Sequence, residues 1–497
     1  MTGSEEPQTE AVLEPGAVGP APPKRPARRR STDPVVHLTR DERRARGAAA
    51  RVLTPRTSLA DVGRGEGRPD PIDLLVEQGR SRVPELVPLR YGRMATSAFA
   101  FYRGAALIMA SDLAAIPDSG LDVQLCGDAH MSNFGLYGTP ERRLLFDLND
   151  FDETLPGPFE WDVKRLVASV EVGARSIGIG HKECRAMIVG VARAYREAMR
   201  GFAKKSNLDV WYARVDVDEF MGEFAPQLGK AQVKRTQSTI AKARTRDHLQ
   251  SVAKLTEVVD GRRRLISDPP LVTSLEELLG AEGALDFSAR MGELVRAYRS
   301  TLQADRRHLL EDYRVIDMAR KVVGVGSVGT RAWILLLQGI DEDDALILQA
   351  KEAQVSVLEQ FLGGSEYTQS GQRVVEGQRL MQAASDAMLG WQRTHGIDGV
   401  VRDFYVRQLR DWKGSAVIET MTPSGLAKYA ELCAFTLARA HARSGDRVAI
   451  AAYLGGSTEA DEAFATFASA YADRTEQDHA LLLEAIASGR LEAINGV

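Results

Sequence analysis

Gly324-Val325-Gly326-Ser327-Val328-Gly329-Thr330-Arg331 is the stretch that decides the fold, because of what the sequence places on either side of it. Residues 315–325, which lead into it, are rich in valine and predict a β-strand. The apolar segments 332–338 and 345–350 follow, with an acidic turn at 341–344 between them, and Lys351 ends the second segment. Short apolar runs bounded by turn residues are typical of strands. The order strand, glycine loop, strand, turn, strand, lysine therefore predicts a β-hairpin followed by a third strand.

The glycine spacing alone is weak evidence, because a chain with 44 glycines can contain it by chance and a dinucleotide-binding fold uses the same spacing. A dinucleotide site requires a helix directly after the loop, whereas here a strand follows. A glycine hairpin over phosphates, with a lysine on the next strand and a glutamate on a helix, is the protein-kinase arrangement. The predicted helix 372–388 contains Glu376, and 403–409 is a further predicted strand. A purely structural glycine hairpin is the alternative.

Polar residues also collect where two earlier apolar strands end. The strand 121–126 leads into 127–135, and the strand 143–148 leads into 149–153. Phosphoryl transfer needs a carboxylate near the attacking hydroxyl and oxygen ligands that hold magnesium on the phosphates. Two ordinary polar turns are the alternative, since Asp and Asn are common turn residues. The candidate residues of this cluster are Asp128, His130, Asn133, Asp147, Asp150 and Asp152.

Two of these segments resemble a known family. Gly127-Asp128-Ala129-His130-Met131-Ser132-Asn133 resembles the catalytic loop of aminoglycoside and choline-type kinases, which has the pattern Gly-Asp-x-His-x-x-Asn. Asn149-Asp150-Phe151-Asp152 resembles their magnesium-binding Asp-Phe segment. The wider chain, from Pro84–Arg90 through Gly377–Arg379 to Tyr405–Gln408, resembles the bacterial family called domain of unknown function 2252. That likeness covers most of residues 70–480 but implies no reaction; the kinase-like segments imply activity.

Carried over residue by residue, the kinase resemblance gives each candidate a role. Asp128 becomes the base that faces the acceptor hydroxyl. His130, in the same catalytic loop, is a second catalytic candidate, which either braces the loop by hydrogen bonds or transfers a proton directly. Asn133 and Asp150 become the metal ligands, with Asp147 and Asp152 as further candidates. The expected nucleotide-binding residues are Gly324, Gly326 and Gly329 over the nucleotide, Lys351 at the α- and β-phosphates, and Glu376 as the ion-pair partner of Lys351, with Glu359 as a competitor.

One departure from the kinase pattern is large. In those kinases the glycine loop and lysine precede the catalytic loop, whereas here they follow it by roughly 200 residues. The predicted helix 426–442 resembles the helix that directly precedes the catalytic loop in ordinary phosphotransferases. We therefore expect a circular permutation, in which Gly445 lies close to Leu125–Gly127 and Lys351 faces Asp150 across one cleft.

The expected fold is α+β, a protein kinase-like two-lobed fold in circularly permuted order. Residues 1–65 are expected to form a disordered basic tail rich in Pro and Arg, because the first aromatic residue of the chain is Tyr91 and such a stretch cannot bury a core. Residues 66–312 are expected to form a helix-rich large lobe with the catalytic and metal loops. Residues 313–415 would be the small nucleotide-binding lobe, and 416–497 would be helices that complete the large lobe.

Charge and cysteine content bear on the binding partners and the cellular location that we expect. The net charge of −4 divides into +4 in residues 1–60 and −8 in the rest, which argues against binding nucleic acid through bulk charge. The basic run 24–30 could contact nucleic acid or an acidic partner, although a solvated tail is the simpler interpretation. Arg90, Arg93 and Arg103 could reach a phosphate-bearing ligand or be ordinary surface or ion-paired arginines. With three scattered cysteines, no CxxC pair and no long apolar run, the expected location is the cytoplasm.

These observations favour an ATP- and Mg²⁺-dependent phosphotransferase that acts on a hydroxyl of a small molecule or a protein. Its expected partners are a nucleotide and this hydroxyl-bearing acceptor. One alternative is a metal-dependent phosphoesterase in which Asp128, His130, Asp147 and Asp150 bind two metals. Another is a catalytically silent, nucleotide-binding interaction protein.

Overall fold

The structure is a computed structural model that describes residues 34–494, except 64, 66, 225–229, 246–247, 323, 325, 327, 410–411 and 413. The prediction for residues 1–33, including the basic run 24–30, lies outside the described residues. The fold is mixed α+β, as expected.

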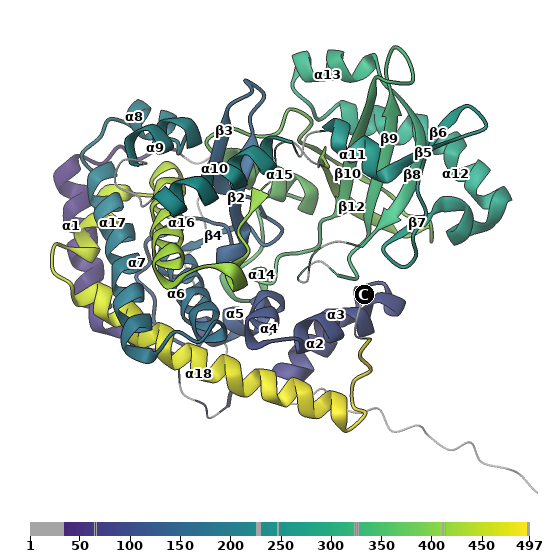
Figure 1. Ribbon diagram of the computed structural model, residues 1–497. Coiled ribbons are helices and arrows are strands. Elements are labelled where there is room, and N and C mark those ends of the chain that lie inside the picture. Colours follow the sequence, from purple (N-terminus) through teal and green to yellow (C-terminus); the bar gives the residue numbers. More distant parts are fainter. Residues whose placement is uncertain are drawn as a thin grey trace, which may run out of the picture.

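A six-stranded antiparallel sheet forms one side of the molecule (Figure 1). Its spatial order is β11-β12-β10-β9-β8-β7. The predicted order strand, glycine loop, strand, turn, strand, lysine is confirmed, because β8 and β9 form a hairpin around the glycine loop and β10 pairs with β9. The strands are β7 (Val272–Ser274), β8 (Arg314–Lys321), β9 (Ala332–Gln338), β10 (Ala345–Glu352), β11 (Gly390–His395) and β12 (Val401–Gln408).

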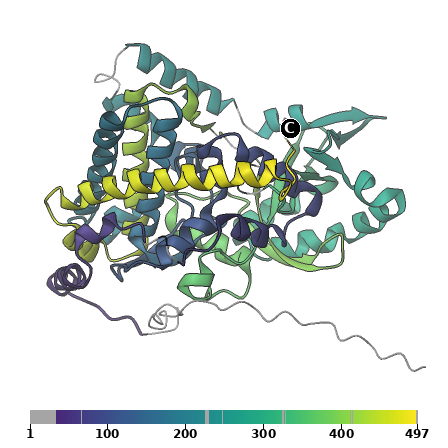
Figure 2. The same ribbon diagram turned by 90° about the horizontal axis from the view of Figure 1, so that it is seen from below.

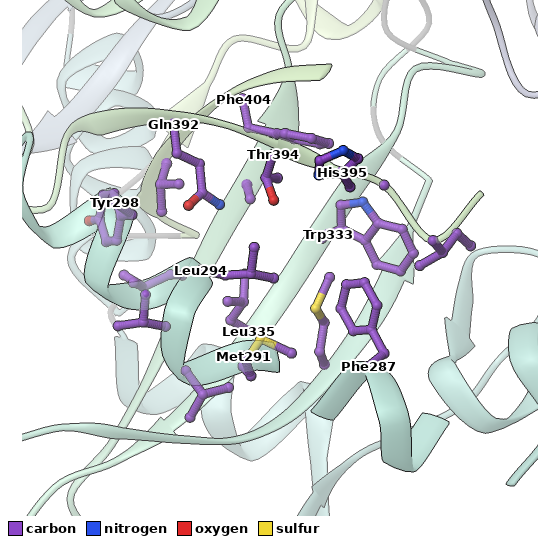
Figure 3. Close-up of a pocket in the computed structure, with 18 of the residues that line it drawn as sticks. Phe287, Met291, Leu294, Tyr298, Trp333, Leu335, Gln392, Thr394, His395 and Phe404 are labelled. Atoms are coloured by element: carbon purple, nitrogen blue, oxygen red, sulfur yellow. The ribbon is translucent and has the colours of Figure 1, made fainter. Parts of the chain in front are cut away.

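The side chains of β10 alternate between the two faces of this sheet. Leu348 and Ala350 face helix α12 (Leu275–Arg299), and Figure 3 shows the apolar layer there, with Met291 of the helix and Leu335 of β9 lining a pocket. This pocket encloses only about 40 Å³. Gln349 and Lys351 lie on the opposite face and line a larger cavity of about 210 Å³. The sheet therefore separates an apolar core from a polar cleft.

Short strands carry the two polar segments predicted above. β1 (Asp122–Leu125) pairs with β4 (Leu155–Pro158), and β2 (Phe134–Gly138) pairs with β3 (Leu144–Leu148), all antiparallel. β13 (Gly414–Ser415) extends the second pair. A separate hairpin joins β5 (Thr256–Val259) to β6 (Arg262–Leu265). Residues 126–133 and 149–153 connect the first two pairs, which brings the two polar segments to the same place.

Helices make up the rest of the molecule. In Figures 1 and 2 the longest helix, α18, runs beneath the others, and α6, α7 and α16 pack together around a continuous apolar core. The N-terminal helices of this group are α2 (Pro71–Gly79), α3 (Val87–Ala95), α4 (Ala98–Gly104) and α5 (Ala106–Ala114). The next are α6 (Phe159–Ser176), α7 (His181–Phe202), α8 (Asn207–Tyr212), α9 (Val217–Phe224), α10 (Lys230–Arg244) and α11 (His248–Leu255). The last are α13 (Ala304–Glu311), α14 (Glu359–Leu362), α15 (Ser370–Met381), α16 (Pro423–Ser444), α17 (Arg447–Leu454) and α18 (Glu459–Ala487). Within the described residues, no helix is both long and apolar enough to cross a membrane.

The N-terminal prediction needs a correction, because part of the expected tail is a helix. α1 (Arg40–Leu53) begins with a capping box, in which Thr39 and Glu42 exchange hydrogen bonds. It packs against α17, and its Gly47 lies so close that a Cβ there would sit 2.1 Å from the carbonyl oxygen of Ala449. Alanine and glycine thus provide close packing in a segment that has no aromatic residue. A composition rule based on large apolar side chains misses such a contact.

The predicted boundary at residue 313, between the large lobe and the small lobe, also differs from the structure. β7 belongs to the six-stranded sheet, and α12 covers one face of it, although both precede residue 313. The hairpin β5–β6 contacts β8 as well. α11 packs against β10 through Val252, so residues from about 248 onward pack with the sheet. The segment 313–415 does not cover the apolar faces of the sheet alone.

Candidate functional site

The segment 127–133, which contains Asp128 and His130, is held at its start by a buried carboxylate on α6. Asp162 accepts hydrogen bonds from the backbone N–H groups of Cys126 (2.7 Å) and Gly127 (3.0 Å). His441 of α16 lies 3.2 Å from the same carboxylate through Nε2, and the Tyr195 hydroxyl lies 2.8 Å from its Nδ1. This network ties the start of the loop to three long helices, α6, α7 and α16. Buried polar groups paired in this way fix a unique geometry.

Gly127 is required by the close approach of the two polar segments. Its φ is +86°, and a Cβ at this position would lie 2.3 Å from the carbonyl oxygen of Glu153. Any side chain would therefore push residues 149–153 away from the loop. A hydrogen bond from Asn149 N–H to the carbonyl oxygen of Asn133, at 2.8 Å, joins the segments again at their other end.

Asp128 projects into the 210 Å³ cleft and is held by a cation. Arg165 of α6 donates from Nε to Asp128 Oδ1 at 2.8 Å, and the same guanidinium stacks on the Tyr102 ring. Burial raises the pKa of Asp128, while Arg165 opposes this rise. The carboxylate is thus oriented, more basic than usual, and still able to face a ligand through its second oxygen.

His130 lies beside Asp128 but is almost fully buried. Its Nε2 is 3.6 Å from Asp128 Oδ2, and its Nδ1 is buried without a hydrogen-bond partner among the described residues. Burial, followed by the nearby charges of Arg165 and Arg103, lowers the pKa of His130 well below its usual range. The imidazole is therefore neutral near pH 7.

Lys351 lies in the same cleft as Asp128, although the two are far apart in sequence. Its Nζ is 2.7 Å from Asp152 Oδ2 and 3.8 Å from Asp150 Oδ2, and the Tyr405 hydroxyl donates to Asp152 Oδ1 at 2.6 Å. Burial disfavours the ammonium, but the carboxylates of Asp150 and Asp152 raise the pKa of Lys351 overall. Lys351 is therefore a permanent cation that faces Asp150 across one cleft.

The pKa values of the two aspartates beside Lys351 are shifted in opposite directions. Burial and the adjacent charge of Asp152 raise the pKa of Asp150. Burial acts in the same sense on Asp152, but Lys351 and the Tyr405 hydroxyl outweigh it and lower the pKa of that carboxyl. Asp152 is thus committed to internal contacts, and Asp150 is the carboxylate of this pair that is more available to a ligand.

The glycine loop contributes two of its three glycines to the cleft. Gly324 and Gly326 line the cavity, whereas Gly329, with φ of +87°, packs against the side chain of Arg82. Val83 N–H donates to the carbonyl oxygen of Gly329 at 2.8 Å, and Arg82 donates to that of Val328. The segment that follows α2 therefore anchors the end of the loop, while Gly324 and Gly326 face the cavity. Val325 and Ser327 lie outside the described residues.

Glu376, the predicted partner of Lys351, does not line the cleft. Among the described residues, the expected pair between Lys351 and Glu376 is not formed: Glu376 on α15 pairs with Arg379 at 3.3 Å, and Lys351 takes Asp150 and Asp152 instead. The competitor Glu359 lies 3.7 Å from Arg373. These pairings differ from the expectation because helical glutamates find arginines on their own or a neighbouring helix.

Asp147 is also excluded from the cleft. It is 1% exposed, and its carboxylate accepts from Arg439 of α16 at 2.5 Å and from Ala383 N–H at 2.9 Å. Side chains alternate along β3, so Asp147 points into the packing against α16, and the segment that follows the strand carries Asp150 to the cleft. Asp147 is therefore a structural ion-pair partner and not a metal ligand.

The cleft also contains side-chain oxygen atoms of the kind that Mg²⁺ binds. Among the described residues, no three His, Cys, Asp or Glu side chains are grouped closely enough to form a metal site by themselves. Magnesium, however, is usually held by one or two carboxylates together with substrate phosphates and water. Asn133 donates its amide N–H to the carbonyl oxygen of Asp128 at 2.7 Å, so its amide oxygen is the atom left for a ligand. Asn133 and Asp150, which both line the cleft, fit such a role.

Several residues of the cleft were not predicted from the sequence. Arg165 and Asp162 of α6 position the loop, and nothing in their local sequence pattern distinguishes them from ordinary charged helix residues. Arg103 was one of three arginines considered for a phosphate, and it does line the cleft. Arg90 is fully buried behind the cleft, where it donates to Gln78 and Gly104. The other polar or charged lining residues that sequence patterns did not identify are Gln78, Arg82, Glu153, Gln349 and Arg407.

Comparison with known proteins gives one match. Residues 82–485 match the model of a family described as an uncharacterized protein conserved in bacteria, DUF2252. No curated protein and no solved structure matches the chain. The match includes both polar segments, the glycine loop and Lys351, so every lining residue of the cleft except Gln78 lies within the matched region. The chain belongs to the DUF2252 family.

Proposed function

We propose that this protein is an ATP- and Mg²⁺-dependent phosphotransferase that transfers a phosphoryl group to a hydroxyl of a small molecule or a protein. The observation that carries this proposal is the meeting of Lys351, Asp150 and Asp128 in one cleft beneath Gly324 and Gly326. These residues come from segments roughly 200 positions apart. If the two polar segments were ordinary turns and the glycine loop an unrelated structural hairpin, nothing would require these residues to lie together.

Each residue has a task that its surroundings support. Asp128, oriented by Arg165, accepts the proton of the acceptor hydroxyl. Lys351 binds the α- and β-phosphates, and Gly324 and Gly326 cover them closely because they lack side chains. Asn133 and Asp150 hold Mg²⁺, which neutralises charge on the phosphates when it is bound. His130, neutral and buried, braces the loop.

A circularly permuted, kinase-like arrangement of two lobes accounts for the chain order. α16 ends at Gly445, where a Cβ would lie 2.4 Å from Val123 Cγ1 of β1. Gln124 N–H donates to the Ser444 hydroxyl at 3.1 Å. The end of α16 therefore lies beside the strand that leads into Asp128, although more than 300 residues separate them in sequence. This contact supports the proposal that α16 precedes the catalytic loop in space and follows it in the chain.

The metal-dependent phosphoesterase receives less support. That alternative needs Asp147 as a ligand, and Asp147 is bound to Arg439 outside the cleft. A silent nucleotide-binding protein would use the same cleft and differs only in the absence of transfer.

Thermal unfolding with nucleotides tests the proposal. A ligand at 100 times its dissociation constant adds ~2.7 kcal/mol to stability. Mg²⁺ with ATP or a non-hydrolysable analogue should therefore raise the Tm of the wild type by a few degrees. Lys351→Ala and Asp150→Asn should lose most of this rise. Lys428→Ala, which removes an exposed lysine that pairs with Glu431 across one helical turn, should retain it.

Transfer of labelled phosphate to candidate acceptors then separates an enzyme from a silent binder. No stabilisation of the wild type by any nucleotide, or equal stabilisation of all three variants, would contradict the proposed site.

A further inference from the structure

Three arginines of the cleft have no carboxylate partner. Arg82, Arg103 and Arg407 line the cavity together with Lys351, and among the described residues none of the three forms an ion pair. Arg103 forms no hydrogen bond through its guanidinium to any described residue, and its Nε is buried. A buried, unpaired cation is costly because desolvation is not offset by attraction. At Arg82 and Arg103 burial outweighs the attraction of nearby carboxylates and lowers the pKa, whereas at Arg407 the charges of Tyr405, Asp150 and Asp152 outweigh burial and raise it. An anion bound beside Arg82 and Arg103 would therefore offset the desolvation of these two cations.

The unpaired cations divide between two walls of the cleft. Arg407 stands on β12 beside β10, so it belongs with Lys351 to the sheet. Arg82 and Arg103 come from the helical segment 71–105, on the other side. Arg90 lies behind Arg82, is fully buried, and also lacks an ion pair among the described residues, which adds positive charge to this wall. The helical wall thus carries an excess of positive charge.

Arg103 is near Asp128, and its charge favours the ionised form of that carboxyl. Asp128 already has its own partner, because Arg165 donates to Oδ1 at 2.8 Å. Arg103 is therefore not required to neutralise Asp128. Its guanidinium is left to face whatever molecule approaches the second oxygen of Asp128.

We infer that Arg103, supported by Arg82, forms an anion-binding subsite on the helical wall, which takes a phosphate or carboxylate group of the acceptor. The assignment to the acceptor rests on the proposed function, in which the acceptor hydroxyl approaches Asp128 and the nucleotide phosphates lie on Lys351. Guanidinium groups suit both kinds of oxyanion through paired N–H donors. The cavity of about 210 Å³ has room for an anionic group beside the nucleotide phosphates. The expected acceptor class is therefore a hydroxyl compound that also bears a phosphate or carboxylate.

Calorimetric titration with inorganic phosphate, and separately with malonate, tests this subsite on the full-length chain. The titrations are made with and without saturating Mg²⁺ and a non-hydrolysable ATP analogue. At least one of the two anions should bind the nucleotide-loaded wild type. Arg103→Gln should weaken this binding by roughly 10- to 100-fold, as expected for a hydrogen bond to a charged group. Arg407→Gln removes the same charge from the opposite wall and should weaken nucleotide binding more than anion binding.

Anions that bind only the nucleotide-free chain, or that lose equal affinity in the two variants, would overturn the subsite. Failure of the nucleotide itself to bind would instead contradict the proposed function. If no nucleotide binds, the titration of the nucleotide-free chain still tests the subsite. A loss of anion affinity in Arg103→Gln but not in Arg407→Gln supports the subsite, and an equal loss in both variants overturns it. Arg103→Lys keeps the positive charge and should retain part of the affinity for the anion. This result would show that the loss of affinity in Arg103→Gln does not come from unfolding.

Discussion

Asp128 shows how single residues define the site, because its carboxylate is held by Arg165 and its second oxygen faces the cleft. Asp128→Asn keeps the shape of the side chain but removes the proton acceptor. We expect transfer to fall by roughly 10²- to 10⁴-fold, the usual contribution of general acid–base catalysis. Nucleotide affinity should change little, since Asp128 is on the acceptor side.

Single-turnover transfer together with nucleotide titration would check this prediction. An equal loss in both measurements would place Asp128 in nucleotide binding instead.

Glu153 is a second single residue with a testable effect, because it should make the stability of the fold depend on pH. Burial raises the pKa of Glu153 to about 7, although Arg373 opposes it. Between the ordinary glutamate pKa of about 4.5 and this value, the folded chain binds more protons at Glu153 than the unfolded chain does. The contribution of Glu153 to stability is therefore complete below that range and declines as the pH rises towards 7.

Glu153→Gln cannot ionise and should remove this decline. Urea unfolding between pH 5 and 8 measures it. Equal pH slopes for variant and wild type would show that Glu153 titrates normally in the folded chain.

The sequence was informative for residues whose roles depend on local order. Asp128, Asn133 and Asp150 follow strands in a recognisable spacing, and Lys351 ends a strand after a glycine loop; the structure brings all four to one cleft. Arg165 could not be predicted because its partner is set by how α6 packs beneath the loop. The predicted ion pair between Glu376 and Lys351 was wrong for a similar reason. The direction in which the side chains of α15 point is set by how this helix packs against β11, β12 and α16, and not by its own sequence pattern.

At the scale of elements, the junction between α16 and β1 carries the permutation hypothesis. Gly445 has an ordinary extended conformation, so alanine would not strain the backbone there. Its Cβ would nevertheless meet Val123 Cγ1 at 2.4 Å and Asp122 O at 3.1 Å. Gly445→Ala should therefore lower the free energy of unfolding by about 1–3 kcal/mol, the usual cost of overpacking. It should also reduce transfer, because β1 leads into Asp128.

Gly201→Ala is the matched control. Gly201 lies near the end of α7 and has no heavy atom within 4 Å of an added Cβ. This variant should be neutral or stabilised by up to about 1 kcal/mol. Equal stability of the two variants in urea unfolding would contradict the close junction.

Elements with strong periodicity or turn signals were predictable, and those defined by small contacts were not. The three strands around the glycine loop and the strand that contains Tyr405 follow from apolar runs between turns. α1 was missed because its contact surface consists of Gly47 and Ala50, which carry little apolar signal. β7 was missed because a three-residue strand is defined by its partner β8 and not by its own sequence.

At the scale of the whole molecule, both apolar packing and polar contacts join the helical part to the side that carries the six-stranded sheet. Arg373 of α15 donates to the carbonyl oxygens of Thr154 and Asp152, and Gln382 donates to that of Leu148. These contacts hold the segment 149–153 against the sheet side. They leave Asp150 facing Lys351 at 3.8 Å, with a cavity between the glycine loop and Asp128.

A crystal structure of the full chain with Mn²⁺ and a non-hydrolysable ATP analogue tests the central claim most directly, because the anomalous signal of Mn²⁺ locates the metal without reference to any model. The proposed function predicts a peak between Asn133 Oδ1 and Asp150, with the nucleotide phosphates between Lys351 and the glycine loop. A nucleotide bound outside this cleft, or crystals with bound nucleotide but no metal at Asn133 and Asp150, would contradict it.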